Sequence, residues 1–207
     1  MEEEFDRQVR TLLDKGYPEL ANLSESEFNK LIEPLRTHIS FLPKTKADLE
    51  QGTIPFVLAV NNSLISAEEM MGKTELNDKP GITKLFPHTS ADFSIIKVEP
   101  PSSPIYLLVD IDRGKETLNI TPEEAYKIIE GEKRSPLTIA EGIALITHFP
   151  EFLQKNNCFS LLASRNPQDQ RVPAIWINAS KQPNLGWCWD RNPHTWLGSA
   201  SASKRVA

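Results

Sequence analysis

The chain has 207 residues, which is enough for one sizeable domain with its own hydrophobic core. Hydrophobic residues make up 39 % and charged residues 25 %, the mean hydropathy is -0.37, and no apolar run approaches the roughly 20 residues of a membrane helix. This composition is typical of a soluble globular protein and argues against a membrane-spanning one. The net charge of -5 and the pI near 5.5 argue against duplex-DNA binding, which usually needs a strongly basic face.

The N-terminal segment, residues 1–50, is predicted to be mainly helical. Apolar side chains recur at helical spacing over residues 5–13. Ser24 and Glu27 have the capping-box pattern, in which each side chain bonds the backbone N–H of the other, and Pro34 should kink or end the helix that follows.

The rest of the chain predicts clusters of strands and clusters of helices. Further capping-box patterns begin at Ser66, Thr121 and Thr138. Strands are predicted where short apolar or β-branched runs lie between Pro, Gly, Asn or Asp, namely residues 54–60, 93–98, 105–111, 158–163, 172–178 and 185–189. Because helices and strands do not alternate regularly, the pattern favours α+β over a doubly wound parallel sheet.

We therefore expect a single α+β domain over residues 1–207, with N-terminal helices packed on a mostly antiparallel or mixed sheet. Its expected divisions are 1–50 mainly helical, 51–120 strands and loops, 121–155 helices, and 156–198 strands with a tryptophan-rich motif. The small polar tail, 199–207, is expected to fray.

The chain begins MEEEFDRQ, which is acidic where targeting segments are basic or apolar, so a cytoplasmic protein is expected. In that compartment Cys158 and Cys188 should stay reduced. No Gly-rich phosphate loop, Ser elbow, HExxH or CxxC pattern is present, and the cysteines and histidines lack the short paired spacings of zinc sites. We therefore predict no cofactor and no metal.

Several polar residues have simple structural explanations. Asp110 and Asp112 precede Gly114, which predicts a tight turn with a positive φ at the glycine. His38, His88 and His148 are expected to be structural or to face solvent.

The C-terminal quarter differs in charge and in aromatic content. Residues 156–207 carry six basic and two acidic side chains, and they contain all four tryptophans, including Trp176. If residues 185–189 form a strand, Trp187 and Trp189 share one face and Cys188 points to the other. A positively charged patch of this kind steers small anions even on an acidic protein.

These residue types suit ligand binding. Indole faces stack on flat rings or sugars, a guanidinium grips a carboxylate or phosphate, and an amide donates and accepts hydrogen bonds. The expected ligand is a small anionic or aromatic molecule, a glycan or a peptide, and the oligomeric state is left open. The candidate binding residues are Trp187, Trp189, Arg191, Asn192, His194 and Trp196, with Arg165 and Arg171 as a positive wall.

Two alternatives stay open from the sequence. The first is a small hydrolase or transferase that uses Cys188 or His194, with Asp190 or Asp169 orienting the imidazole. Cysteine is among the most buried residue types, which favours an inert thiol instead. The second alternative is that the tryptophans are core residues and the motif only closes the sheet.

Four segments in order carry a resemblance: FDRQVRTLLDKGYPEL near the start, PLTIAEGIAL at 136–145, RVPAIWIN at 171–178, and LGWCWDRNPHTWLGSAS at 185–201. On these, the chain resembles an uncharacterised bacterial family, a domain of unknown function, over nearly its full length. The resemblance implies a bacterial cytosolic protein and supplies no activity, cofactor or catalytic residue.

Overall fold

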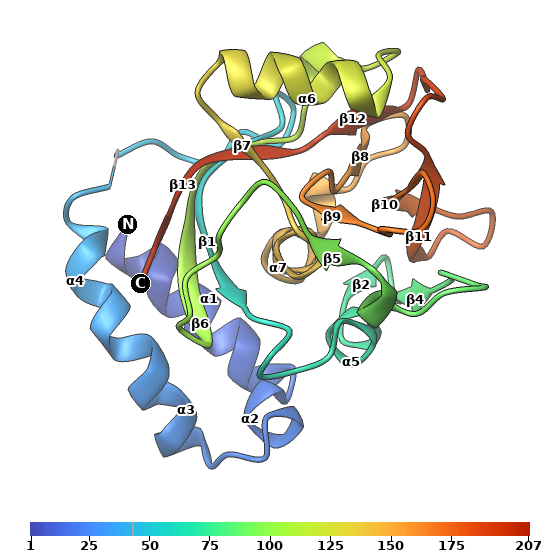
Figure 1. Ribbon diagram of the computed structural model, residues 1–207. Coiled ribbons are helices and arrows are strands. Elements are labelled where there is room, and N and C mark those ends of the chain that lie inside the picture. Colours follow the sequence, from blue (N-terminus) through green and yellow to red (C-terminus); the bar gives the residue numbers. More distant parts are fainter. Residues whose placement is uncertain (43) are drawn as a thin grey trace.

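The computed structural model describes residues 1–42 and 44–207 and confirms a single α+β domain. Figure 1 shows two sheets with helix α7 (Ile139–His148) between them, and the N-terminal helices on the far side of the first sheet. One continuous hydrophobic core runs through these layers. None of the helices in the described residues is both long and apolar enough to cross a membrane.

The N-terminal helices follow the sequence pattern closely. The Ser24–Glu27 capping box is present, since the Glu27 N–H donates to Ser24 Oγ (3.3 Å) and the Ser24 N–H donates to Glu27 Oε2 (2.9 Å). Pro34 lacks an N–H, and the chain changes there from an α-helix to a single 3-10 turn. The bounds are α1 (Glu2–Asp14), α2 (Tyr17–Leu20), α3 (Glu25–Ile32), the 3-10 turn Glu33–Leu35 and α4 (Arg36–Ile39).

The first sheet is antiparallel throughout. Its four strands in the described residues lie in the order β1 (Thr53–Val60), β6 (Ile105–Asp112), β13 (Ser201–Val206) and β7 (Ser135–Pro136). The expectation that the tail 199–207 frays is therefore wrong, because most of it is an interior strand. Its polar composition is tolerated because Arg205 has a buried carboxylate partner, Glu141.

Within the described residues, the outer edge of β1 is closed by side chains instead of a further strand. The Gln8 amide on α1 donates to Phe56 O (3.1 Å) and accepts from the Leu58 N–H (2.8 Å). The ring of His148, at the end of α7, lies 2.9 Å from Leu58 O through Nε2. These contacts satisfy backbone N–H and C=O groups that would otherwise be free to pair with another chain.

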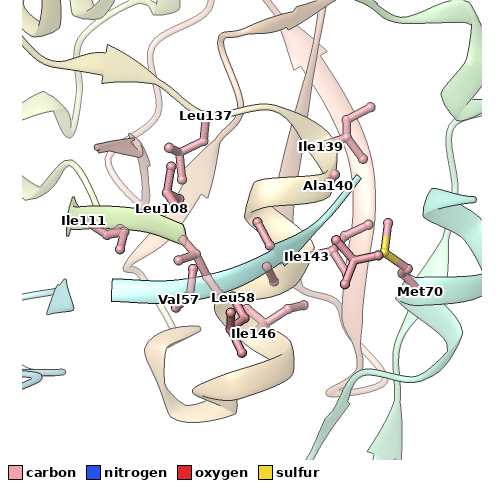
Figure 2. Close-up of a cluster of buried hydrophobic side chains, with 14 of the residues drawn as sticks. Val57, Leu58, Met70, Leu108, Ile111, Leu137, Ile139, Ala140, Ile143 and Ile146 are labelled. Atoms are coloured by element: carbon pink, nitrogen blue, oxygen red, sulfur yellow. The ribbon is translucent and has the colours of Figure 1, made fainter. Parts of the chain in front are cut away.

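Helix α7 is largely apolar and is buried on every side, together with its two ionisable side chains, Glu141 and His148. Ile143 and Ile146 pack in one cluster with Val57 and Leu58 of β1, and with Met70 of α5 (Ala67–Gly72) (Figure 2). The same cluster includes Phe159, Ala174 and Leu185 of the second sheet, so the helix joins the two sheets.

The second sheet is mixed and carries the tryptophans. Its strand order is β12 (Leu197–Ser199), β8 (Cys158–Ser160), β10 (Arg171–Ile177), β11 (Pro183–Trp189) and β4 (Ile82–Thr83). The expected strand over 93–98 is much shorter than predicted. Only its first part forms β5 (Ser94–Ile95), which pairs with β9 (Ser164–Arg165), while β2 (Glu75–Leu76) pairs with β3 (Lys79–Pro80).

Helix α6 (Pro122–Gly131) covers a small second cluster at this sheet. Ala125 and Ile129 of the helix pack with Leu162 and Val172, and Cys188 lies against them. This cluster fixes which face of β11 is interior.

The predicted turn after β6 is present. Gly114 has a φ of 85°, and its N–H donates to Asp112 Oδ1 (2.6 Å). A Cβ at this position would also lie 2.3 Å from Ser199 O. We therefore expect Gly114→Ala to lower the free energy of unfolding by about 2 kcal/mol or more in urea denaturation, from left-handed backbone strain together with the close contact.

Gly131→Ala is the matched control, since a Cβ there meets nothing within 4 Å. Its stability should be unchanged or about 0.5–1 kcal/mol higher, as for a glycine replaced in a helix. Equal stabilities for the two variants would contradict the tight approach at Gly114.

Candidate functional site

The register of β10 and β11 divides the aromatic residues between two faces of the sheet. Trp189 stands opposite Arg171, and Trp187 stands opposite Pro173. Because side chains alternate along a strand, these residues share one face, and Trp176 belongs to the other. The prediction that Trp187 and Trp189 lie on one face is confirmed.

On the first face an arginine is stacked on both indoles. The Arg171 guanidinium carbon lies 4.3 Å from the centre of the Trp187 ring and 5.0 Å from that of Trp189. The two indoles meet edge to face, with centroids 5.1 Å apart. Such contacts are favourable because the electron-rich ring face attracts a cation. We call these three residues the Arg171 stack.

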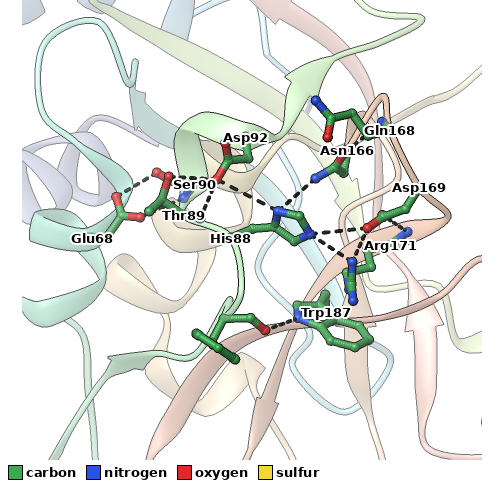
Figure 3. Close-up of polar contacts among 11 residues, drawn as sticks. Glu68, His88, Thr89, Ser90, Asp92, Asn166, Gln168, Asp169, Arg171 and Trp187 are labelled. Atoms are coloured by element: carbon green, nitrogen blue, oxygen red, sulfur yellow. Dashed lines mark hydrogen bonds and ion pairs between the residues drawn. The ribbon is translucent and has the colours of Figure 1, made fainter.

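A polar network holds the Arg171 stack in place (Figure 3). Arg171 Nη1 forms an ion pair with Asp169 Oδ2 and lies 2.8 Å from His88 Nε2, which is itself 3.2 Å from the same carboxylate. Desolvation raises the pKa of Asp169, but the Arg171 backbone N–H, the guanidinium charge and the hydrogen bonds outweigh it and hold this pKa below its usual value. Asp169 is therefore ionised and neutralises Arg171.

The orientation of His88 follows from its neighbours. Asn166 Oδ1 accepts from the Gln168 N–H (2.8 Å), which leaves its Nδ2 facing His88 Nδ1 at 3.2 Å. Through its two ring nitrogens, His88 thus bridges Asn166 to the Asp169–Arg171 ion pair. His88 was expected to be structural or to face solvent, and the structure gives it a central place in this network.

A strongly exposed aromatic residue is bonded to the stack through its backbone carbonyl. Phe86 is 87 % exposed, and its carbonyl accepts from the Trp187 indole N–H (3.1 Å). Trp189 is 45 % exposed. In the part of the chain that the structure describes, the other exposed large hydrophobic residues are Phe41 and Ile95. We call Phe86, Trp187 and Trp189 the aromatic surface.

The remaining residues of the motif lie elsewhere. Trp196 packs against Trp176 of the opposite face, with ring centroids 6.3 Å apart, and His194 lies 5.0 Å from the Trp196 ring. Asn192 Nδ2 is 3.5 Å from His194 Nε2, and desolvation lowers the pKa of His194. The chain crosses here from β11 to β12, which lies on the far side of β8 and β10. The structure thus separates Trp196 and His194 from the aromatic surface, whereas the Asn192 N–H donates to Trp189 O (3.1 Å).

Arg165 and Arg191 lie apart from both the aromatic surface and the Trp176–Trp196 pair. They line an open cleft of about 470 Å³ beside α6. Arg165 pairs with Asp190 at 2.6 Å, and Arg191 lies 3.8 Å from Glu123. Other cleft residues include Lys97, Tyr126 and Lys127. The cleft carries both signs of charge, so Arg165 does not form a positive wall for the tryptophans, whereas Arg171 contacts them directly.

The environment of Cys188 does not favour a nucleophile. Its side chain lies against the apolar cluster under α6, on the face opposite Trp187. Burial raises the pKa of the thiol to about 11, which outweighs the opposing hydrogen bond from Ser160 and the charge of Arg165. Only the thiolate attacks, so little reactive form exists at neutral pH.

Metal chemistry has no assembled ligand set in the described part of the chain. Residues 1–42 and 44–207 contain no group of three or more His, Cys, Asp or Glu side chains that could hold a metal ion.

Three residues of the site were not among the candidates: Phe86, His88 and Asn166. They come from loops that lie about 80 residues apart in the chain, and neither loop has a local signal that links it to the other. Asp169 was considered only as a partner for His194, and the structure pairs it with His88 and Arg171.

The fold and the site together define an α+β domain with an aromatic surface on a mixed sheet. Arg171, which is neutralised by Asp169, packs against the two indoles of this surface. The chain belongs to a family of unknown function (DUF5701), whose model matches residues 11–207. No curated protein matches the chain, and no solved structure matches it.

Proposed function

We propose that the protein is a binding module whose ligand docks on the aromatic surface. The observation that carries this proposal is the exposure of Trp189 (45 %), a member of the Arg171 stack, and of Phe86 (87 %), whose carbonyl accepts from the Trp187 indole N–H. Soluble domains usually bury rings of this size, and Trp and Arg are enriched among the residues that dominate binding energies.

The network around Arg171 supports a preformed surface. Trp187 is held by its hydrogen bond to Phe86 O and by the guanidinium, and Arg171 is held by Asp169. Side chains fixed before binding lose little conformational entropy when the ligand arrives. Because Asp169 neutralises Arg171, the ligand is recognised by ring stacking more than by a free charge on that arginine.

The alternative of a hydrolase or transferase has less support. The Cys188 thiol has its pKa raised to about 11, and no hydrogen bond in the described residues joins it to His194. The alternative of a purely structural motif predicts buried rings, whereas Trp189 is nearly half exposed.

A thermal-shift screen against nucleotides, sugars and short peptides tests the proposal, with tryptophan fluorescence as a second readout. We expect a ligand that raises Tm and whose affinity falls by about tenfold or more, roughly 1.4 kcal/mol, in both Trp189→Ala and Phe86→Ala. Both side chains are exposed, so the variants should fold.

Phe41→Ala is the matched control, because Phe41 is 83 % exposed but lies in the N-terminal helical region. It should bind the same ligand normally. Affinity that is unchanged in Trp189→Ala and Phe86→Ala, or lost equally in Phe41→Ala, would contradict the proposal.

A further inference from the structure

The backbone of β11 beside the aromatic surface has an open edge. Pro173 has no N–H, and its carbonyl accepts from Leu161 N (2.8 Å), on the side away from β11. Since Pro173 stands opposite Trp187, these two residues exchange no hydrogen bonds, and the Trp187 N–H and C=O point away from β10. Trp189, two residues further along, points its backbone groups the same way.

The neighbouring strand β4 ends before it reaches this point. It pairs only with Asn184 and Leu185, and the last backbone bond runs from Lys84 N to Leu185 O (2.7 Å). The chain then turns, with His88 N bonded to Leu85 O (3.0 Å).

Of the groups on this edge, Trp189 O accepts from Asn192 N (3.1 Å). Among the described residues, no backbone bond satisfies the Trp187 N–H, the Trp187 C=O or the Trp189 N–H on this side. Together these three groups have the spacing that an added strand would use.

The charges at the two ends of this edge favour an acidic partner. Lys84 is exposed at one end, and Arg191 is exposed at the other. The carboxylate of Glu123 is 3.8 Å from Arg191, whereas Asp190 is paired with Arg165.

We infer that the edge of β11 at residues 187–189 accepts an extended acidic peptide as an additional strand, in line with β4. This inference rests on the proposed function and names its partner. Main-chain hydrogen bonds to Trp187 and Trp189 supply the pairing, alternate peptide side chains lie on the two indoles, and the peptide carboxylates face Lys84 and Arg191.

The test uses a fluorescein-labelled acetyl-Glu-Val-Glu-Val-Glu-Val-amide peptide and fluorescence anisotropy with the full chain. Three further peptides serve for comparison: two versions of the same sequence that are N-methylated on alternate residues, one in each register, and the Lys-Val counterpart. We expect the acidic peptide to bind, one N-methylated register to bind at least about tenfold more weakly, and the basic peptide not to bind.

Protein variants test the charge argument. Lys84→Glu combined with Arg191→Glu should weaken binding of the acidic peptide by about tenfold or more, while Lys204→Glu, an exposed lysine on the other sheet, should not. Equal affinities for the parent and both N-methylated peptides would overturn strand addition, as would failure of the acidic peptide to bind.

The same experiments separate this inference from the proposed function. If the acidic peptide fails while a sugar or nucleotide binds and loses affinity in Trp189→Ala, the aromatic surface is a binding site and strand addition is wrong. If Trp189→Ala changes the affinity of no ligand, the proposed function fails and this inference fails with it.

Discussion

Replacing Arg205 with alanine is expected to lower the free energy of unfolding by about 3–5 kcal/mol, because it leaves a buried carboxylate without its partner. Arg205 Nε and Nη2 donate to the two oxygens of Glu141 at 2.5 and 2.8 Å. The Glu141 side chain is 0 % exposed and also accepts from the Tyr106 hydroxyl (2.8 Å). The fork-to-carboxylate geometry is the strong form of such a pair.

The contacts with Glu141 also stabilise the charged form of Arg205. Burial by itself lowers the pKa of Arg205, but the hydrogen bonds and the charge of Glu141 outweigh it, so this pKa is raised. The pair anchors β13 to α7, since Glu141 caps that helix through the Thr138 N–H (2.8 Å). Its loss should therefore affect the sheet and the central helix together.

Urea denaturation measures this effect, with Lys204→Ala as the control. Lys204 is the exposed neighbour on the same strand, and its removal should change stability by no more than about 0.5 kcal/mol. If both variants unfold at the same urea concentration, the buried pair does not contribute as described.

A second large effect is expected from acid. Burial lowers the pKa of His148 from 6.5 to about 3, against the opposing hydrogen bond to Leu58 O. The unfolded chain therefore binds this proton more readily than the folded one. The stabilisation is fully present above about pH 6.5 and is lost as the pH falls toward about 3, with a total on the order of 5 kcal/mol.

His148→Gln isolates this contribution. The glutamine amide is able to donate to Leu58 O and does not titrate in this range. Urea unfolding at a series of pH values should show the parent losing up to about 1.4 kcal/mol per pH unit more than the variant between about pH 6 and 4. Acid also protonates carboxylates such as Asp169, whose pKa is lowered, and this loss of stability is the same in both proteins. Parallel pH profiles would contradict a neutral, buried His148.

Local sequence signals predicted local structure well. The capping boxes at Ser24 and Thr138 formed because each needs only residues three positions apart. The strands β1 and β6 were predicted from continuous apolar runs, which match burial on both faces.

The strand β13 was missed because its residues are polar and its partners are distant. Ser203 Oγ donates to Val109 O (3.1 Å), and Arg205 meets Glu141 from 64 positions away. The sequence of residues 199–207 has no hydrophobic periodicity that predicts either contact.

Strand alternation made it possible to predict which side chains of β11 share a face. The contacts that depend on the path of the chain between strands could not be predicted. Alternation places Trp187 and Trp189 together and Cys188 opposite, as the structure shows. The separation of Trp196 from them depends on the crossing to β12, which the spacing of the motif does not contain. His88 reaches Arg171 only because two distant loops meet.

The most direct test of the binding surface is an NMR titration that follows the indole N–H signals of the four tryptophans. The acidic peptide is added, and then each compound that raises Tm in the screen. Saturable shifts of the Trp187 and Trp189 signals are expected, while Trp176 and Trp196, on the opposite face, stay unchanged. Saturable shifts confined to Trp176 and Trp196 would contradict the account.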